Sequence, residues 1–147
     1  MKIVNLDGYT TNPGDLSWDW LGNYGEYKVY DRTAPEQIVE RAKGADILII
    51  NKSVITAQML ENLPNLKFVG LQSTGYNVID CKAARARNIT VSNIPAYSTT
   101  GVAQLVFAFI LQVADNVSLH SDAVHNGEWC ECPDFCFWKT PLTELDG

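Results

Sequence analysis

The stretch KFVGLQSTGYNVID, residues 67–80, changes character halfway along its length. Its first half contains a short apolar run, Phe68–Leu71, which has the length and composition of a buried strand. Its second half places Ser73–Asn77, small polar residues around a glycine and a tyrosine, directly after that run. Ligands bind at the carboxyl ends of parallel strands, so this stretch predicts a strand that leads into a functional loop.

Four other segments share the strand character of this one, and they lie at residues 2–6, 27–31, 46–50 and 89–93. Segments with helical spacing separate them, at residues 34–44, 56–64 and 79–88. Thr56 is a typical N-cap and Gly44 a typical helix stop. Strands that alternate with helices form βαβ units, so we predict a flavodoxin-like, doubly wound parallel five-stranded sheet in the order 2-1-3-4-5.

The pattern changes after the fifth strand. Residues 98–124 read as one long helix, capped by Ser98 or Thr99, whose apolar residues cover more than one face and predict burial on two sides. Residues 125–147 lack periodicity and read as an extended arm that packs four aromatic residues on another surface: Trp129, Phe135, Phe137 and Trp138. The sequence therefore divides into residues 1–97, which form the α/β domain, and residues 98–147.

The composition limits the classes of function. With 147 residues, 46% of them hydrophobic and 19% charged, the chain is large and apolar enough for one globular domain. A net charge of -6 excludes a nucleic-acid surface, which needs clustered basic residues. The N-terminus lacks a signal peptide's apolar stretch, and residues 101–114 are too short and too amphipathic to span a bilayer. We expect a soluble, cytoplasmic protein with no membrane or nucleic-acid partner.

The cysteines raise the question of a metal. Three of the four lie in CECPDFC, residues 130–136, and His120 and His125 precede them. Their spacing matches no standard zinc pattern, so we expect reduced thiols, as in a cytosolic protein, and no metal.

Two of the loops that follow strands hold the candidate site. Successive amides around Gly75, which would let the backbone turn tightly, can form a nest for a carboxylate or phosphate. Lys52, at the end of the third strand, would add a positive charge. The alternative is that Ser73–Asn77 form an ordinary turn and that Lys52 is merely solvated. Several such loops converge at one sheet edge, which favours a site for a small acid.

No catalytic constellation accompanies this site. The sequence has no G-x-G-x-x-G and no phosphate-binding P-loop motif. A receiver-type signalling domain would need an aspartate at the end of the third strand, where Asn51 stands, and a flavodoxin would need a phosphate loop after the first strand. From the residues alone, the chain is a small-acid or small-anion binding α/β domain.

Longer motifs point to a family. LQSTGYNVID, VSNIPAYSTTGVAQLVFAFIL, LDGYTTNPGDLSWD and the series NGEW, DFCFW and PLTELDG together resemble the N-terminal part of a D-isomer-specific 2-hydroxyacid dehydrogenase, of the glycerate dehydrogenase (hydroxypyruvate reductase) type. The resemblance covers essentially the whole chain. It implies a flavodoxin-like substrate domain followed by a Rossmann domain, and an enzyme that reduces 2-keto acids such as hydroxypyruvate with NAD(P)H.

The resemblance also implies roles for single residues. The family's substrate loop, whose amides hold the substrate carboxylate, matches Ser73, Thr74, Gly75, Tyr76 and Asn77.

Other positions would line the substrate pocket or meet the cofactor. Thr74 would also face the cofactor, and Lys52 falls where the glycerate branch lines its pocket. Thr100 and Val102 begin the helix that approaches the nicotinamide in the family, and Gln104 stands where many relatives have glutamate.

The printed sequence stops before the family's glycine-rich loop and its catalytic Arg, acid and His, so none of the catalytic residues is expected in it. We therefore expect an N-terminal fragment that is inactive alone, with NAD or NADP used by the full-length enzyme and none bound here. Expected partners are a small carboxylic acid and, through residues 98–147, further copies of the chain. The alternative is a stand-alone small-acid-binding or regulatory domain.

Overall fold

The computed structural model describes residues 1–134 and 136–146, and it divides the chain into two compact units, Met1–Tyr97 and Ser98–Gly147. We call them unit 1 and unit 2 and describe each by itself.

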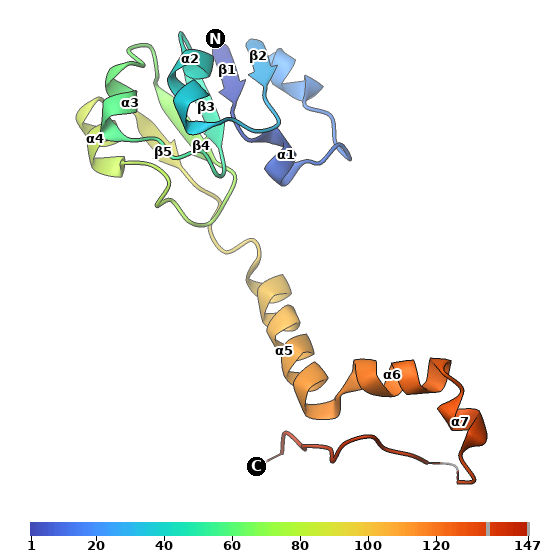
Figure 1. The fold of residues 1–147 in the computed structure, drawn as a ribbon. Coiled ribbons are helices and arrows are strands. Elements are labelled where there is room, and N and C mark those ends of the chain that lie inside the picture. Colours follow the sequence, from blue (N-terminus) through green and yellow to red (C-terminus); the bar gives the residue numbers. More distant parts are fainter. Residues whose placement is uncertain (135, 147) are drawn as a thin grey trace. The chain divides into compact units, whose positions relative to one another are not determined.

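Unit 1 is built on one parallel sheet, seen in Figure 1. Its strands are short, and in chain order they are β1 (Lys2–Asn5), β2 (Glu26–Val29), β3 (Ile47–Ile50), β4 (Phe68–Leu71) and β5 (Thr90–Ser92). Every neighbouring pair is parallel and the spatial order is β2-β1-β3-β4-β5. The predicted fold class and strand order are confirmed.

Short helical segments connect the strands. They are α1 (Gly8–Thr11), η1 (Asp19–Asn23), η2 (Pro35–Gln37), α2 (Ile38–Ala42), α3 (Ala57–Glu61) and α4 (Cys81–Ala86). The Thr56 side chain accepts a hydrogen bond from the amide of Met59 and caps α3, as predicted, and Asp80 caps α4 in the same way. Gly44 adopts φ +75° just after α2, a conformation that favours glycine and stops the helix.

One face of the sheet carries the main core. Val4, Leu48 and Val69 are paired in register across β1, β3 and β4, and all three are fully buried. They cluster with Ile38, Ala42, Leu60 and Ala84 from α2, α3 and α4. The helices that follow β2, β3 and β4 therefore cover the same face, as right-handed crossovers require for this strand order. The opposite face is covered less completely, because Ile47, Ile49 and Phe68 are only half-buried.

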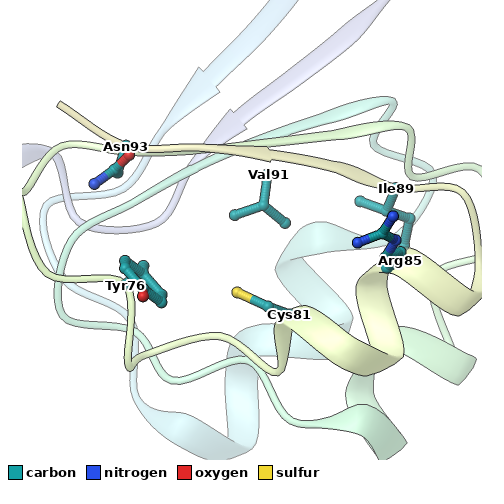
Figure 2. Close-up of a pocket in the computed structure, with 6 residues that line it drawn as sticks. All are labelled: Tyr76, Cys81, Arg85, Ile89, Val91 and Asn93. Atoms are coloured by element: carbon teal, nitrogen blue, oxygen red, sulfur yellow. The ribbon is translucent and has the colours of Figure 1, made fainter. Parts of the chain in front are cut away.

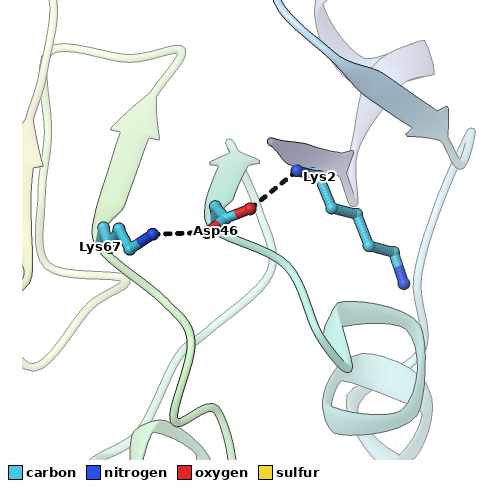
Figure 3. A network of polar contacts seen from close by, with 3 residues as sticks. All are labelled: Lys2, Asp46 and Lys67. Atoms are coloured by element: carbon cyan, nitrogen blue, oxygen red, sulfur yellow. Dashed lines mark hydrogen bonds and ion pairs between the residues drawn. The ribbon is translucent and has the colours of Figure 1, made fainter.

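An aspartate ties the amino ends of three strands together, as Figure 3 shows. The Asp46 carboxylate accepts a hydrogen bond from the amide of Lys2 at 2.9 Å and pairs with the Lys67 ammonium at 2.8 Å. The bond from Lys67, followed by that from the Lys2 amide, lowers the pKa of Asp46 below its ordinary value. Asp46 thus joins the start of β3 to the starts of β1 and β4.

Unit 2 contains α5 (Thr99–Asp115), α6 (Val117–His125) and α7 (Glu128–Glu131). The prediction of one continuous helix over residues 98–124 is wrong, because Asn116 breaks it with φ 50° and ψ 44°. Asparagine adopts this left-handed conformation more readily than most residues. Its amide donates to the Gln112 carbonyl at 3.0 Å, and its side-chain amide donates to Thr140 Oγ1 at 3.0 Å. Ser98 occupies the N-cap position of α5 without a side-chain cap bond.

The first helix of this unit exposes its apolar residues. Of its seventeen residues only Ala114 is buried, so the predicted burial on two sides is not found in this chain. Among the described residues no single helix is long and apolar enough to cross a membrane; α5 and α6 taken together pass that test of length and composition, but they are bent by 63°.

The arm after α7 packs on its own unit. The Phe137 ring lies 5.6 Å from that of Trp129 and 6.2 Å from that of His120. Lys139 donates its amide to His120 Nε2 at 3.1 Å and pairs its ammonium with Glu128. Trp138 remains largely exposed, and the aromatic residue predicted at 135 lies outside the described residues.

Candidate functional site

The loop after β4, residues 72–78, lies at the carboxyl edge of the sheet and is tied to the segment after β5. The Thr74 hydroxyl donates to the Ile94 carbonyl at 3.0 Å, and the Asn93 side-chain amide donates to the Thr74 carbonyl at 2.8 Å. The Ile94 amide donates to the Ser73 carbonyl at 3.1 Å. Three hydrogen bonds therefore join two loops that are about 20 residues apart in the sequence.

Within Ser73–Tyr76 the carbonyls and the hydroxyls of Ser73 and Thr74 make hydrogen bonds, whereas the last three backbone amides make none within the part of the chain that the structure describes. The Ser73 hydroxyl donates to the Gly75 carbonyl at 2.8 Å. The backbone amides of Thr74, Gly75 and Tyr76 donate to no acceptor in residues 1–134 and 136–146. All three residues are exposed, as is Asn77. The loop thus offers successive N–H donors to solvent, the arrangement that holds carboxylates and phosphates in backbone nests.

Gly75 does not adopt a positive φ, the backbone conformation that favours glycine. Its predicted role, to let the backbone turn tightly, stays a prediction. A Cβ at this position would meet only the Asn77 side-chain oxygen, at 3.4 Å. An alanine side chain would therefore be accommodated at this position.

Lys52 lies on the neighbouring loop after β3, and its backbone has a structural partner. The amides of Asn51, Lys52 and Ser53 donate to one carboxylate oxygen of Asp7, at 2.8, 3.0 and 2.9 Å. The Ser53 hydroxyl donates to the other oxygen at 2.9 Å. This second amide nest is therefore filled from within by a residue that is only 3% exposed. The Lys52 side chain is exposed and lines a cavity of about 350 Å³ with Arg32 and Thr33.

Sequence reasoning missed Asp7. The signal available was an aspartate directly after the first strand, followed by glycine, in LDG. The four donors that it meets come from residues 44 to 46 positions away, which the sequence pattern does not reveal.

The substrate-loop residues line other hollows. Tyr76 lines an open cavity of about 370 Å³ together with Asn93, Cys81 and Arg85. Figure 2 shows Tyr76 on the side of Asn93 and Cys81, with Arg85 at the other end of the cavity. Asn77 lines a third hollow, next to Val54. The structure thus groups Ser73, Thr74 and Tyr76 with the segment after β5. It groups Asn77 with the loop after β3, and Lys52 with the loops after β1 and β2. The two loops are still joined, because the Ile55 amide donates to the Val78 carbonyl at 2.8 Å.

The two residues predicted to meet a cofactor lie in unit 2. Thr100 and Val102 are exposed residues in the first turn of α5. Their approach to the loop after β4 stays a prediction.

The cysteines and histidines form no metal centre among the described residues. No group of three or more His, Cys, Asp or Glu side chains could hold an ion there. The four cysteine thiols are free. Both histidines use Nδ1 to contact backbone carbonyls within α6 or at its start, His120 with Asn116 and His125 with Ser121.

The fold and motifs define a class of protein. A family model described as "D-isomer specific 2-hydroxyacid dehydrogenase, catalytic domain" matches residues 10–138. The chain therefore belongs to the D-isomer specific 2-hydroxyacid dehydrogenase family, as its motifs predicted.

Within that family, the chain is similar to proteins named hydroxypyruvate reductase and glycerate dehydrogenase. The hydroxypyruvate reductase of Blautia hydrogenotrophica is 47% identical, over 100% of this chain and 47% of that protein. The glycerate dehydrogenase of Methylorubrum extorquens is 37% identical, over 83% of this chain and 39% of that protein. The chain spans less than half of the length of these curated relatives.

Solved structures agree on the fold. An acyclic imino acid reductase in complex with NADPH and D-Arg superimposes with a TM-score of 0.72 and 30% identity, covering 86% of this chain and 41% of that one. A D-lactate dehydrogenase from Aquifex aeolicus, complexed with NAD and lactic acid, gives a TM-score of 0.68 over 86% of this chain and 37% of that one. At 23% identity, this second likeness shows the fold alone.

Proposed function

We propose that this chain is the substrate-binding part of an NAD(P)-dependent oxidoreductase that reduces 2-keto acids such as hydroxypyruvate to D-2-hydroxy acids such as glycerate. The observation that carries the proposal is a set of backbone amides that donate to no acceptor among the described residues, those of Thr74, Gly75 and Tyr76. They lie at the carboxyl edge of a parallel sheet. The family membership and the relatives named hydroxypyruvate reductase and glycerate dehydrogenase support the substrate class.

In this proposal Ser73–Asn77 bind the carboxylate of the 2-keto acid through backbone N–H groups. The carboxylate is thereby held at one end, which orients the adjacent carbonyl carbon. The exposed ammonium of Lys52, on the adjoining loop, adds positive charge to the same edge and favours an anionic substrate. Thr74, Thr100 and Val102 are the residues proposed to approach the nicotinamide in the complete enzyme.

Residues 1–97 would then be the substrate domain, and residues 98–147 the connecting helix and dimerisation arm that lead to an NAD-binding domain. The dinucleotide itself does not fit the residues present, because no two glycines in the sequence stand in a G-x-G pair and a glycine-rich turn is what cradles the pyrophosphate. We therefore propose that the chain alone binds no NAD(P) and transfers no hydride, and we derive no reaction step within it.

A titration followed by ¹H–¹⁵N NMR tests the site. Hydroxypyruvate or glycerate is expected to shift the amide resonances of residues 74–76 with millimolar affinity, because a few exposed donors contribute little binding free energy to a carboxylate. Gly75→Pro removes one donor and should abolish the shifts. Gly75→Ala keeps the donor and is the matched control, since its Cβ has space. Shifts confined to other loops would contradict the proposal.

An activity assay tests the proposal that the chain alone transfers no hydride. Purified chain with hydroxypyruvate and NADH is expected to show no turnover. Turnover that a substitution within residues 1–147 abolishes would show that the chain carries its own catalytic groups.

We further propose that the chain self-associates through residues 98–147. Five apolar residues of α5 are 42–62% exposed: Val102, Leu105, Val106, Phe109 and Ile110. At roughly 25 cal/mol per Å² of apolar surface, covering them in a two-fold dimer would contribute several kcal/mol. Sedimentation should show a dimer or a higher closed oligomer at micromolar concentration, and a monomer would refute this.

The alternative is a stand-alone small-acid-binding or regulatory domain. The compactness of unit 1 is compatible with that function as well. The length of the parent reading frame separates the two functions.

A further inference from the structure

Three successive carbonyls in the loop after β4 each accept a hydrogen bond. The Ile94 amide donates to the Ser73 carbonyl at 3.1 Å. The Asn93 side-chain amide donates to the Thr74 carbonyl at 2.8 Å. The Ser73 hydroxyl donates to the Gly75 carbonyl at 2.8 Å. Each carbonyl oxygen of this stretch is therefore held in place by a donor of its own.

The peptide bond links each of these carbonyls to one of the open amides. In a trans peptide unit, the C=O bond and the following N–H bond lie in one plane and point in opposite directions. No cis peptide bond occurs among the described residues. A donor that holds a carbonyl thereby turns the amide of the same peptide unit away from itself. The amides turned in this way are those of Thr74, Gly75 and Tyr76.

Asn93 contributes its side chain to this set from outside the proposed substrate loop. It directly follows Ser92, the last residue of β5, which is paired in register with Gly70 of β4. Its side chain is half-buried and lies at the Tyr76 end of the cavity in Figure 2. A strand of the sheet thus fixes the position of this donor, which bonds to the Thr74 carbonyl 19 residues away in the sequence.

The Thr74–Gly75 peptide unit depends most on such a donor. Glycine restricts its own backbone less than any other residue, so this unit would rotate easily if its carbonyl were released. An anion gains most from backbone N–H groups that already point at it, because a mobile peptide unit must first be ordered at a cost in conformational entropy. A carboxylate site made of main-chain amides therefore needs side chains that hold the carbonyls.

We propose that Asn93 is a positioning residue for the substrate carboxylate, which it does not itself contact. Its side-chain amide holds the Thr74 carbonyl and so aims the Gly75 amide at the ligand. The Ser73 hydroxyl does the same for the Tyr76 amide. This inference rests on the proposed function, in which the loop after β4 binds the carboxylate through its N–H groups.

NMR of the whole chain tests the role of Asn93 without and with a ligand. In the free chain, Asn93→Ala should move the ¹³C carbonyl resonance of Thr74 upfield, the change expected when a carbonyl loses a hydrogen bond. In titrations, this variant should bind glycerate about fivefold more weakly at the amides of residues 74–76. Asn65→Ala, which removes an exposed side-chain amide from the loop before β4, is the matched control and should change neither value.

Two further measurements separate positioning from other roles. In the unsubstituted chain, glycerate should shift the side-chain NH₂ resonances of Asn93 less than the three backbone amides, since that NH₂ group faces the Thr74 carbonyl. Ser73→Ala should weaken glycerate binding by a similar factor, and Ser73→Thr, which keeps a hydroxyl, should restore most of the loss. Unaltered amide resonances of β4 show that each variant keeps its fold.

Equal glycerate binding by Asn93→Ala and the unsubstituted chain would overturn the inference and leave the proposed function standing. A Thr74 carbonyl resonance that Asn93→Ala leaves in place would do the same. Shifts of the Asn93 side chain that exceed those of the backbone amides would make it a ligand-contacting residue and would also overturn the positioning role. If glycerate shifted no amide of residues 74–76 in the unsubstituted chain, the proposed function would fail and this inference with it.

Discussion

Removing the Asp7 carboxylate should destabilise unit 1 strongly, because this one side chain accepts four hydrogen bonds from the loop after β3. Asp7→Ala leaves the buried amide and hydroxyl of Ser53 without an acceptor. It also leaves the part-buried amides of Asn51 and Lys52 without one. A buried donor without an acceptor costs about 1–3 kcal/mol, and the two part-buried amides recover some of that from water. We therefore expect a loss of about 3–4 kcal/mol in the free energy of unfolding.

Two companion variants separate charge from hydrogen bonding. Asp7→Asn keeps an oxygen that can accept from the three amides, while the Ser53 hydroxyl can turn to accept from the new amide group, so the expected loss is about 1–2 kcal/mol. Ser53→Ala removes only the hydroxyl bond and should cost about 1 kcal/mol. Urea denaturation followed by circular dichroism gives the three values. If Asp7→Ala cost no more than Ser53→Ala, the three amide bonds would not be holding the loop after β3, and the reasoning would be refuted.

Three other predictions concern single contacts. The pKa of Asp46 is lowered in the folded state, so the ionised carboxylate stabilises the fold at pH values above its ordinary pKa of 3.8. This stabilisation is lost as the pH falls through the lower pKa of the folded state. Asp46→Asn should therefore flatten the decline of the denaturation midpoint between about pH 5 and 2. Asn116→Gly should be more stable than Asn116→Ala by about 1–2 kcal/mol in thermal melts, since both lose the bond to Thr140 and only alanine is strained at φ 50°. Gly8→Ala would place a Cβ 2.5 Å from Val29 Cγ1 and should cost about 1–3 kcal/mol, most of which Val29→Ala in the same chain should restore; equal losses in the single and double variants would contradict the close approach.

Local patterns were sufficient for the architecture of unit 1. Short apolar runs and helical spacing are properties of neighbouring residues, so the five strands and their parallel order follow from them and from the handedness of crossovers. The caps at Thr56 and Gly44 were found for the same reason, because each acts within one turn of its helix.

The backbone conformation of a single residue was harder to predict. Gly75 was expected to let the backbone turn tightly, and the structure shows only that it does so without a positive φ. Asn116 lies inside the stretch whose spacing predicts one helix. Its side chain bonds to the arm at Thr140, and the break at this residue is not visible in the spacing alone. Propensity is a weak prior, and tertiary contacts override it.

By itself the sequence determined the class of fold, the family and the place of the candidate loop, because strand period and loop composition are encoded within short windows. Only the tertiary structure decided how that edge is used. It left the amides of Thr74, Gly75 and Tyr76 open, filled those of residues 51–53 with Asp7, and brought Arg32 beside Lys52. These outcomes depend on contacts between segments that are 20 or more residues apart, and such contacts arise only when parallel strands bring their carboxyl ends to one edge.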